Sequence, residues 1–489
     1  MKERIGWITV TLNDIAKWGS GGTPKSTKKE YYGGDIPWLI IGDLNDGLVW
    51  HSTKKITDEG LKNSSAKIVA PNNILIALYG SIGKLGINKI PVATNQAIAF
   101  TQKIHTSTNI KYLFYFLLFS RQDLYKLGKG GTQRNISQTV LKKVKFPLPP
   151  FPEQRAIVNK IEQLFSELDN GIANLKLAQE QLKVYRQAVL KQAFTGELTR
   201  TWREEHQSEI ESPIALLNRI VEGRKLILGE KIFSKKNACN EPSSIPDFLI
   251  PEEWLWITPK VIASPYDPYA LTIGPFGSNL KVSDYRKSGV PLIFVKNIRS
   301  GSFHNSETKF VSKEKADELR PHQAESGDIL ITKMGEPPGD ATQYPANHSK
   351  AIITADCVKF RLNPILEEKR FFVYLINSPI IKNQIAQITK GVAQKKISLE
   401  RFREIALPFP SIAEQQAIVN EIETRLSVCD KLEQDITDSL EKAEALRQSI
   451  LKQAFEGKLL NEQELAAVRN DPEWEPAEAL LARIKSKTI

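Results

Sequence analysis

Two segments of this 489-residue chain repeat one another at a constant distance along the sequence. One reads EQRAIVNKIE from Glu153 and the other reads EQQAIVNEIE from Glu414, a separation of 414 − 153 = 261 positions. The same separation aligns LKQAFTGEL, from Leu190, with LKQAFEGKL, from Leu451, without a gap. A repeat of constant spacing indicates a duplicated structural unit, so the chain is expected to fold into two equivalent halves.

Both repeated segments have the apolar periodicity of a helix, with a proline before each run and a glycine after it. About 40 residues at about 1.5 Å per residue form a rod about 60 Å long. A rod with one apolar stripe is stable mainly with a partner, and we expect the two copies to pack antiparallel as an intramolecular coiled coil. The alternative is that each helix packs on its own globular domain. The apolar positions are Ile157, Ile161, Leu164, Leu168, Ile172, Leu175, Leu182 and Val189 in the first copy, and Ile418, Ile422, Leu426, Cys429, Ile436, Leu440, Ala443 and Ile450 in the second.

The regions in front of the two helices correspond more loosely. GGDIPWLIIGDL from Gly33 aligns with KSGVPLIFVKNI from Lys287, and GKGGTQRNIS from Gly128 aligns with TKGVAQKKIS from Thr389. Both regions contain glycine, proline and short runs of β-branched residues, a pattern typical of strands joined by turns. We therefore predict the α/β fold class (mixed α+β), with two globules, two long antiparallel helices and a pseudo-twofold repeat.

The predicted order of parts follows from the repeat and from the polar stretch between its copies. A shorter match, ALLNRI from Ala215 and ALLARI from Ala479, indicates a short helix after each long one. The expected boundaries are 1–145 for the first globule, 146–200 for the first long helix, 201–250 for a short helix and linker, 251–405 for the second globule, 406–460 for the second long helix and 461–489 for a C-terminal helix.

Composition narrows the classes of protein. The formal net charge of +11 favours a polyanionic partner, because each neutralised phosphate releases counterions. The three cysteines are scattered and support neither disulfides nor a zinc site. The first residues lack the apolar core of a signal peptide, and the longest apolar run, 112–119, is shorter than the roughly 20 residues of a membrane span. We expect a cytoplasmic protein without a membrane partner.

Motifs for self-contained catalysis are incomplete. The segment GSIGKL from Gly80 has neither the glycine spacing of a phosphate-binding loop nor a hydroxyl after its lysine. Asp267-Pro268-Tyr269 is superficially similar to the catalytic tetrapeptide of amino-methyltransferases, but it lacks one proline and no glycine-rich cofactor loop precedes it. The histidines are not paired with an acid or a cysteine. The sequence therefore predicts a chain that is not an enzyme.

Several longer motifs match one family. The segment SGGTPKSTKKEYYGGDIPWLIIGDLNDG from Ser20 resembles the opening of a target-recognition domain, and GTQRNISQTVLKKVKFPLPPFPEQRAIV from Gly131 resembles its exit into a helix. PFGS from Pro275 and the two copies of LKQAF-x-G-x-L complete the pattern. On these motifs, essentially the whole chain resembles the specificity subunits of type I restriction-modification enzymes.

The resemblance implies a non-catalytic DNA-binding subunit of a restriction system for phage defence. It implies a split double-stranded DNA target, with one half-site read by each target-recognition domain and the spacer set by the paired helices. Two methyltransferase subunits, which methylate adenine with S-adenosylmethionine, and restriction subunits, which use ATP and Mg²⁺, are the implied partners. No cofactor is expected in this chain. The second domain opens with LTIGPFGSNL in place of Gly-Gly-Thr-Pro, which indicates a different half-site.

Candidate DNA contacts are polar side chains in glycine-rich loops, where the backbone can approach a base edge. The matched loops Gln133-Arg134-Asn135 and Gln394-Lys395-Lys396 are the strongest pair, although any single lysine has the alternative of a solvated surface charge. Tyr31, Tyr32 and Trp38 have the alternative of contacting a base, but they are expected to pack in the core. The predicted contacts are Thr23, Lys25, Ser26, Lys28, Lys29, Lys129, Gln133, Arg134 and Asn135 in the first globule, and Ser278, Asn279, Lys281, Lys296, Asn297, Lys390, Gln394, Lys395 and Lys396 in the second.

The duplicated helix ends are the predicted docking surfaces for two methyltransferase subunits, because identical partners bound pseudo-symmetrically require duplicated surfaces. The alternative is that these ends pack against each other or on the adjacent globules. An alternative function for the whole chain is a coiled-coil interaction scaffold that recognises no DNA sequence.

Overall fold

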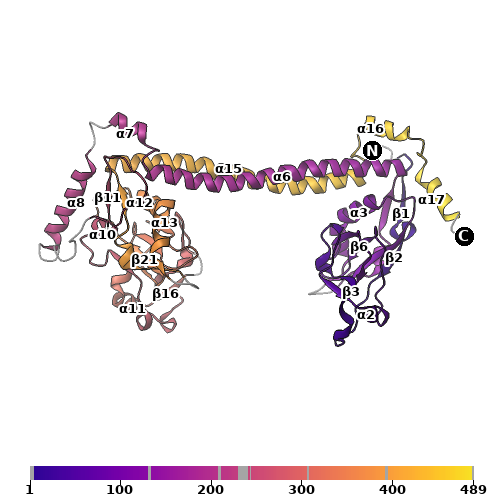
Figure 1. Ribbon diagram of the computed structural model, residues 1–489, viewed down its shortest axis with the longest axis horizontal. Coiled ribbons are helices and arrows are strands. Elements are labelled where there is room, and N and C mark those ends of the chain that lie inside the picture. Colours follow the sequence, from indigo (N-terminus) through magenta and orange to yellow (C-terminus); the bar gives the residue numbers. More distant parts are fainter. Residues whose placement is uncertain are drawn as a thin grey trace. The chain divides into compact units, whose positions relative to one another are not determined.

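The computed structural model describes residues 5–129, 134–206, 211–229, 241–242, 244–305, 308–390 and 395–486. The chain divides into two compact units, one of residues 1–176 with 437–489 and the other of residues 177–436. Each division falls within a long helix, α6 (Phe151–Phe194) or α15 (Ile412–Phe455) (Figure 1). Each unit therefore contains a globule, the first part of one long helix and the last part of the other.

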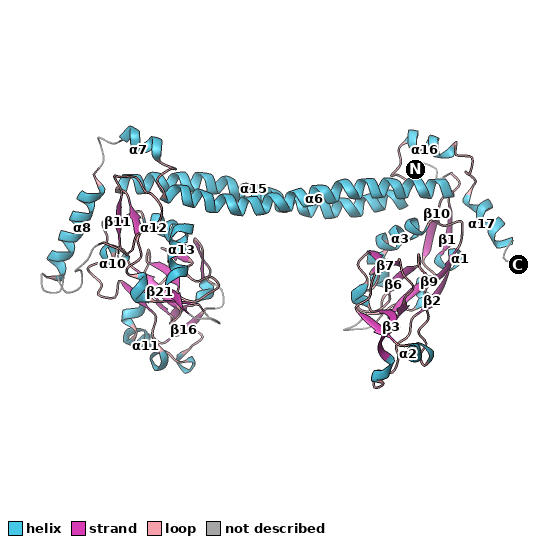
Figure 2. Ribbon diagram, in the orientation of Figure 1, coloured by secondary structure: helices cyan, strands magenta, loops and turns pink. Residues whose placement is uncertain are grey.

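The first unit is built on a sheet with the strand order β2-β9-β6-β7-β4, in which β4 and β7 are parallel and the other pairs are antiparallel. A smaller sheet has the order β5-β3-β8, and β1 pairs with β10 next to the start of α6 (Figure 2). The strands are β1 (Ile8–Thr11), β2 (Ala16–Ser20), β3 (Tyr32–Leu39), β4 (Gly47–Val49), β5 (Lys54–Ile56), β6 (Ile74–Ala77), β7 (Leu85–Asn88), β8 (Ala93–Thr94), β9 (Ile98–Ile104) and β10 (Lys145–Leu148). The shorter helices are α1 (Leu12–Ile15), α2 (Asp58–Lys62), α3 (Ile110–Phe119), α4 (Arg121–Leu127), α5 (Gln138–Lys142), α16 (Glu462–Arg469) and α17 (Ala477–Ser486).

The second unit repeats this plan. Its sheets have the orders β12-β21-β18-β19 and β16-β13-β20-β17, and β11 pairs with β24 as β1 pairs with β10. The strands are β11 (Leu255–Ile257), β12 (Leu271–Ile273), β13 (Val290–Ile293), β14 (Ile298–Arg299), β15 (Ser302–Phe303), β16 (Lys309–Val311), β17 (Gln323–Ala324), β18 (Ile329–Thr332), β19 (Ala341–Gln343), β20 (Ala351–Ile353), β21 (Cys357–Phe360), β22 (Thr389–Lys390), β23 (Lys396–Ile397) and β24 (Leu407–Phe409). The shorter helices are α7 (Arg200–His206), α8 (Pro213–Leu228), α10 (Pro259–Ile262), α11 (Lys313–Glu318), α12 (Lys369–Asn377), α13 (Pro379–Ile388) and α14 (Leu399–Phe402).

The long helices α6 and α15 are each 44 residues long and pack antiparallel. In the first unit Arg447 of α15 forms an ion pair with Asp169 of α6, and in the second unit Arg186 of α6 bonds Asp430 of α15 at 2.7 Å. Positions 169 and 430 are equivalent in the repeat, as are 186 and 447, so the same pair forms twice with the helices exchanged. The predicted intramolecular coiled coil and its pseudo-twofold repeat are confirmed.

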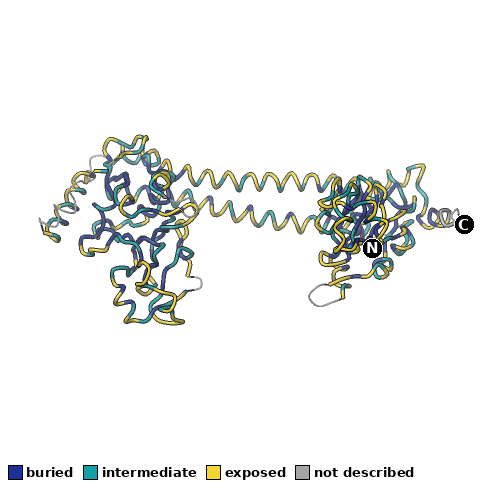
Figure 3. The backbone as a smooth tube through the Cα atoms, turned by 60° about the horizontal axis from the view of Figure 1, so that its bottom comes forward, coloured by how far each residue is buried: buried dark blue, intermediate teal, exposed yellow. Residues whose placement is uncertain are grey.

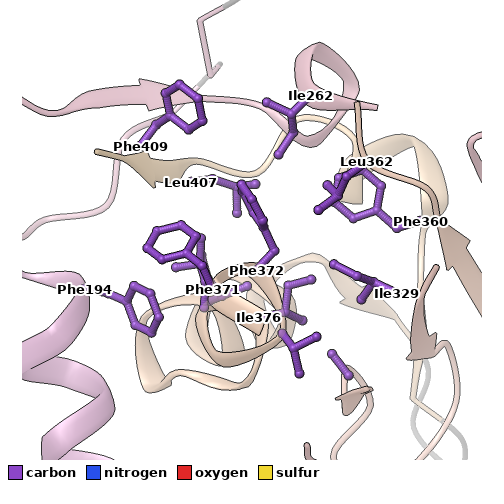
Figure 4. Close-up of a cluster of buried hydrophobic side chains, with 14 of the residues drawn as sticks. Phe194, Ile262, Ile329, Phe360, Leu362, Phe371, Phe372, Ile376, Leu407 and Phe409 are labelled. Carbon is purple, nitrogen blue, oxygen red and sulfur yellow. The ribbon is translucent and has the colours of Figure 1, made fainter. Parts of the chain in front are cut away.

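The first turns of each long helix pack on the globule that precedes them in the chain, as the alternative expected. Each helix then ends in the core of the other globule, which neither expectation included. In the second unit Phe194 contacts Phe371 of α12, with ring centroids 5.4 Å apart, inside a core that includes strand β24 (Figure 4). In the first unit the equivalent Phe455 packs among Tyr112, Phe116 and Phe119 of α3. Buried residues gather in the globules and at these junctions, whereas the central turns of both helices are largely exposed (Figure 3).

The segment after each long helix packs on the globule of the unit in which that helix ends. After α6, Leu216 and Ile220 of α8 enter the core of the second unit. After α15, the backbone amide of Ala477 donates to the carbonyl of Gly6 at 3.0 Å in the first unit. The short match ALLNRI and ALLARI therefore marks equivalent docking helices. In the part of the chain that the structure describes, every helix is too short or too polar to cross a membrane.

Candidate nucleic-acid interface

Polar segments of the first unit meet where β2 and β6 end and β9 begins. The amide of Gly21 donates to the carbonyl of Ile98 at 3.1 Å, and the amide of Leu78 donates to that of Ala97 at 2.8 Å. The amide of Ile136 then donates to the carbonyl of Leu78 at 3.0 Å. These bonds place segments 21–29, 78–84, 94–97 and 134–136 side by side at one end of the sheet. We call this the first loop surface.

Close backbone packing fixes the Gly-Gly-Thr-Pro motif on this surface. A Cβ at Gly21 would lie 2.2 Å from the carbonyl oxygen of Thr94, so only glycine fits there. Beneath the motif the Trp38 indole donates to the carbonyl of Gly22 at 3.0 Å, and the Tyr32 hydroxyl donates to that of Pro24 at 2.6 Å. Trp38 is buried and Tyr32 half-buried, as expected for core packing. The motif is therefore fixed to the core, and the lysines that follow it, Lys25, Lys28 and Lys29, are exposed.

The predicted contacts of the first unit are exposed on these segments. Lys25, Ser26, Lys28 and Lys29 follow the motif, and Lys28 bonds Glu30 at 3.2 Å. The hydroxyl of Thr23 donates to the carboxamide of Gln96. Lys129 and Asn135 exchange two backbone hydrogen bonds of 2.9 Å, which closes the loop that carries the exposed Arg134. Gln133 lies outside the described residues.

The second unit forms an equivalent surface through equivalent bonds. The amide of Gly274 donates to the carbonyl of Cys357 at 3.1 Å, and that of Lys333 donates to the carbonyl of Asp356 at 2.8 Å. The amide of Ile397 donates to the carbonyl of Lys333 at 3.0 Å. Segments 274–281, 333–340, 354–357 and 395–397 therefore meet at the corresponding end of the sheet. We call this the second loop surface.

Most predicted contacts of the second unit that the structure describes are on this surface. Ser278, Asn279 and Lys281 are exposed after β12, and Lys395 and Lys396 are exposed at β23. Lys390 ends β22, but its side chain lies outside the described part, as does all of Gln394. Lys296 is half-buried in the turn after β13.

Asn297 is placed differently from the prediction and leaves the candidate set. Its side chain is 2% exposed. Its carbonyl accepts from the amide of Phe294 at 2.8 Å, and its NH₂ group donates to the carbonyl of His304 at 2.8 Å. The aligned residue of the first unit, Asp43, accepts from the amide of Ile40 at 2.8 Å in the same way. This residue therefore caps a turn, and its amide faces inward.

Exposed aromatic rings at both surfaces were missed from the sequence. The guanidinium carbon of Arg134 lies 5.0 Å from the ring centroid of Tyr125 in α4, and Nζ of Lys333 lies 4.5 Å from that of Phe276. Tyr125 lies four residues before the predicted contact Lys129, but an isolated aromatic residue is usually part of the core, so it was not chosen. Phe276 lies within the PFGS motif, which was the available signal.

The incomplete enzyme motifs have structural roles. Residues 80–84 turn the chain from β6 into β7 with no helix following, so they do not form a phosphate-binding loop. Asp267 bonds Nζ of Lys359 at 3.1 Å and the guanidinium of Arg361 at 3.0 Å. Burial lowers the pKa of Lys359 and its pairing with Asp267 opposes the shift. Within the described residues, no group of three His, Cys, Asp or Glu side chains is placed to hold a metal ion.

The duplicated Glu-Gln at the start of each long helix is buried. Glu153 accepts from the indole of Trp7 at 2.9 Å, and Glu414 accepts from that of Trp254 at 2.8 Å. Gln154 donates to the carbonyl of Ser107 at 2.8 Å. Internal packing, the alternative to partner docking, therefore accounts for the buried part of the duplicated helix ends.

Comparison with known proteins gives one consistent family. A family model described as the type I restriction modification DNA specificity domain matches residues 4–177 and 289–442. The type I restriction enzyme EcoBI specificity subunit of Escherichia coli is 23% identical and is matched over 93% of this chain and 86% of its own length. The MjaVIII specificity subunit of Methanocaldococcus jannaschii is also 23% identical, over 93% of both chains.

Solved structures share the fold. The crystal structure of an HsdS subunit from Thermoanaerobacter tengcongensis superposes with a TM-score of 0.54, 15% identity and coverage of 93% of this chain and 98% of that one. A structure described as a basis for complex assembly and conformational transition of the type I R-M system gives a TM-score of 0.64, at 15% identity and 93% and 99% coverage.

Proposed function

This chain belongs to the family of type I restriction-modification DNA specificity subunits, and we propose that each of its loop surfaces reads one half of a split double-stranded DNA target. The observation that carries the proposal is the equivalence of the two surfaces. The same backbone bonds build both, yet their side chains differ, with Thr23 and Lys25 on one and Phe276 and Ser278 on the other. Equal scaffolds with different contacts suit two different half-sites.

The chemistry of each surface suits DNA. Exposed lysines such as Lys28 and Lys396 supply charge for phosphates, which position a protein without reading sequence. Asparagine makes paired hydrogen bonds to adenine, so Asn135 is the proposed base-reading residue of the first surface. Asn279 has that role on the second. The other exposed contacts predicted from the sequence stay in the proposal, and Asn297 is removed.

The helix pair supports the proposed split target. The chain passes between the globules through α6 and α15, and the same arginine–aspartate pair joins the two helices in each unit. We propose that this helix pair sets the spacer between half-sites. Readers on one face of a duplex require half-site centres about 34 Å apart, or a multiple of that distance.

Exposed residues that are identical in both copies support docking of two equal partners. Packing does not require these residues to be the same. We propose that they bind two adenine-methylating methyltransferase subunits, one at each unit, and that restriction subunits join this assembly. Among them are Asn159, Ser166, Gln448 and Lys452 in the first unit and Asn420, Ser427, Gln187 and Lys191 in the second.

In this assembly the catalytic activities belong to the partner subunits. We propose that the chain acts in the cytoplasm and has no catalytic activity of its own. S-adenosylmethionine, ATP and Mg²⁺ would be bound by the partner subunits, which carry out methylation, translocation and cutting.

Salt dependence of DNA binding tests the proposed interface against the scaffold alternative. Changing Lys25, Lys28 and Lys29 to glutamine should reduce the slope of log affinity against log salt by about two to three, since each phosphate contact contributes about 0.9. The matched control changes Lys17, Lys103 and Lys143, exposed lysines away from the loop surface, and should leave the slope unchanged. DNA binding whose affinity does not depend on salt, or equal slopes for both triple variants, would contradict the proposal that the first loop surface binds DNA.

A further inference from the structure

Each loop surface carries an exposed aromatic ring with a cation on it. Phe276 is 57% exposed and Tyr125 is 47% exposed. Lys333 and Arg134 lie against these rings. The rings come from positions that are not equivalent, since Phe276 follows β12 and Tyr125 is on α4. Two unrelated positions thus produce the same chemical feature on each loop surface.

The cation on each ring has limited internal bonding. Besides the ring, Nζ of Lys333 lies 3.4 Å from the carbonyl of Ala355. Arg134 contributes its backbone carbonyl to the amide of Gly80 at 3.3 Å, while its side chain is exposed. An exposed cation–π contact is worth about 0.5–1 kcal/mol, less than a charge-assisted bond to phosphate, so DNA can draw the cation from the ring.

We propose that the Phe276 and Tyr125 rings each contact the face of a base in their half-site, while Lys333 and Arg134 bond phosphates. This inference rests on the proposed function. Every base has a π face, and apolar side chains inserted at a base step unstack it. The rings would therefore add affinity and local distortion of the DNA to the hydrogen-bond readout. The exposed lysines of the loop surfaces cannot unstack a base in this way.

The test uses the full chain assembled with its methyltransferase partner. The probe is a duplex carrying the split motif found by methylome sequencing, with 2-aminopurine placed at successive positions of the half-site read by the second unit. The wild-type complex should raise the fluorescence at the adenine that the methyltransferase extrudes and at one further position, where a base unstacks against Phe276. Only the second change reports the ring contact. Phe276→Ala should remove this change and weaken binding about 10- to 100-fold, the loss expected for one stacked base. Phe276→Tyr should retain most of both.

Matched controls separate the ring contact from a general loss of structure. Tyr269 is 48% exposed but lies before β12, at the other end of that strand from Phe276, so Tyr269→Ala should behave as wild type. For the other half-site, Tyr125→Ala should act as Phe276→Ala does, with Trp50→Ala, beyond β4, as its control. Lys333→Gln should lower the salt slope by about one.

The outcomes distinguish this inference from the proposed function. If Phe276→Ala and Tyr269→Ala give equal affinity and fluorescence on the motif duplex, the ring contact is wrong while half-site reading stands. If the wild-type complex does not prefer the motif duplex to a scrambled one, the proposed function fails and this inference fails with it.

Discussion

Replacing Phe455 with alanine is expected to lower the free energy of unfolding of the first unit by about 4 kcal/mol, as for other buried phenylalanines. The ring is buried, and its centroid lies 5.2, 5.4 and 5.4 Å from those of Tyr112, Phe116 and Phe119. These contacts attach the end of α15 to α3. The substitution would leave a cavity at the point where the second long helix joins the first globule.

Hydrogen exchange in increasing urea measures this effect, because it follows the strands of each unit separately. Strand β9 of the first unit should lose protection at lower urea, while β21 of the second should change little. Leu446→Ala is the control, since Leu446 is half exposed on the same helix and should cost less than about 1 kcal/mol. A loss of unfolding free energy below 1 kcal/mol for Phe455→Ala, or equal losses in both units, would contradict the claim that Phe455 attaches α15 to the first globule.

The equivalent glutamates at the helix starts are expected to respond differently to removal of their charge. Glu414 accepts from Thr199 at 2.8 Å and from Nε of Arg203 at 2.9 Å, and the side chains of Glu414 and Arg203 are almost fully buried. Glu414→Gln would leave the Arg203 charge uncompensated, at a cost of about 3 kcal/mol. At Glu153 the positions of Thr199 and Arg203 are taken by Leu460 and Glu464. Glu153→Gln should therefore change stability by less than about 1 kcal/mol, or increase it.

The pH dependence of the first unit's stability shows whether the Glu153 charge stabilises or destabilises the fold. Burial raises the pKa of Glu153, while its bond from Trp7 and the charge of Arg469 oppose the shift. Because the folded state then holds this proton more tightly than the unfolded state, the contribution of Glu153 to stability is largest below the unfolded pKa of about 4.5 and falls as the pH rises through the folded pKa. Urea unfolding from pH 4 to 8 should show this decline for the wild type and lose it in Glu153→Gln. An identical decline in both would show that another group is responsible.

The constant separation of the repeat was enough to predict the helix pair, because an apolar stripe of this length needs a partner and the chain supplies an equal one. Asp169 and Arg447 could not be paired beforehand, since the register of two helices depends on how their ridges pack. The duplicated Glu153 and Gln154 were ambiguous for a related reason. Residues are kept identical in both copies either because they form the same buried contacts or because they bind the same partner. The sequence alone does not distinguish these two reasons.

The loop surfaces were predicted in part. Glycine-rich segments identified the positions of Lys25 and Arg134, because close backbone packing leaves the neighbouring side chains exposed. Asn297 was misassigned because an asparagine in a turn suits either a base contact or a cap. Its alignment with Asp43, which also caps a turn, was the signal that favours the cap. Tyr125 lies four residues before Lys129, but only the fold shows that its ring is exposed and lies against Arg134.

Exchange of one recognition domain tests the central claim most directly. The segment from Ser20 to Phe146 would be replaced by that of another family member, and the methylome of a host expressing the chain with its methyltransferase partner would be sequenced. We predict a split motif with methyladenine in both half-sites. The exchange should alter one half-site and leave the other half-site and the spacer unchanged. No split motif with an active methyltransferase, or a change in both half-sites after the exchange, would contradict this claim.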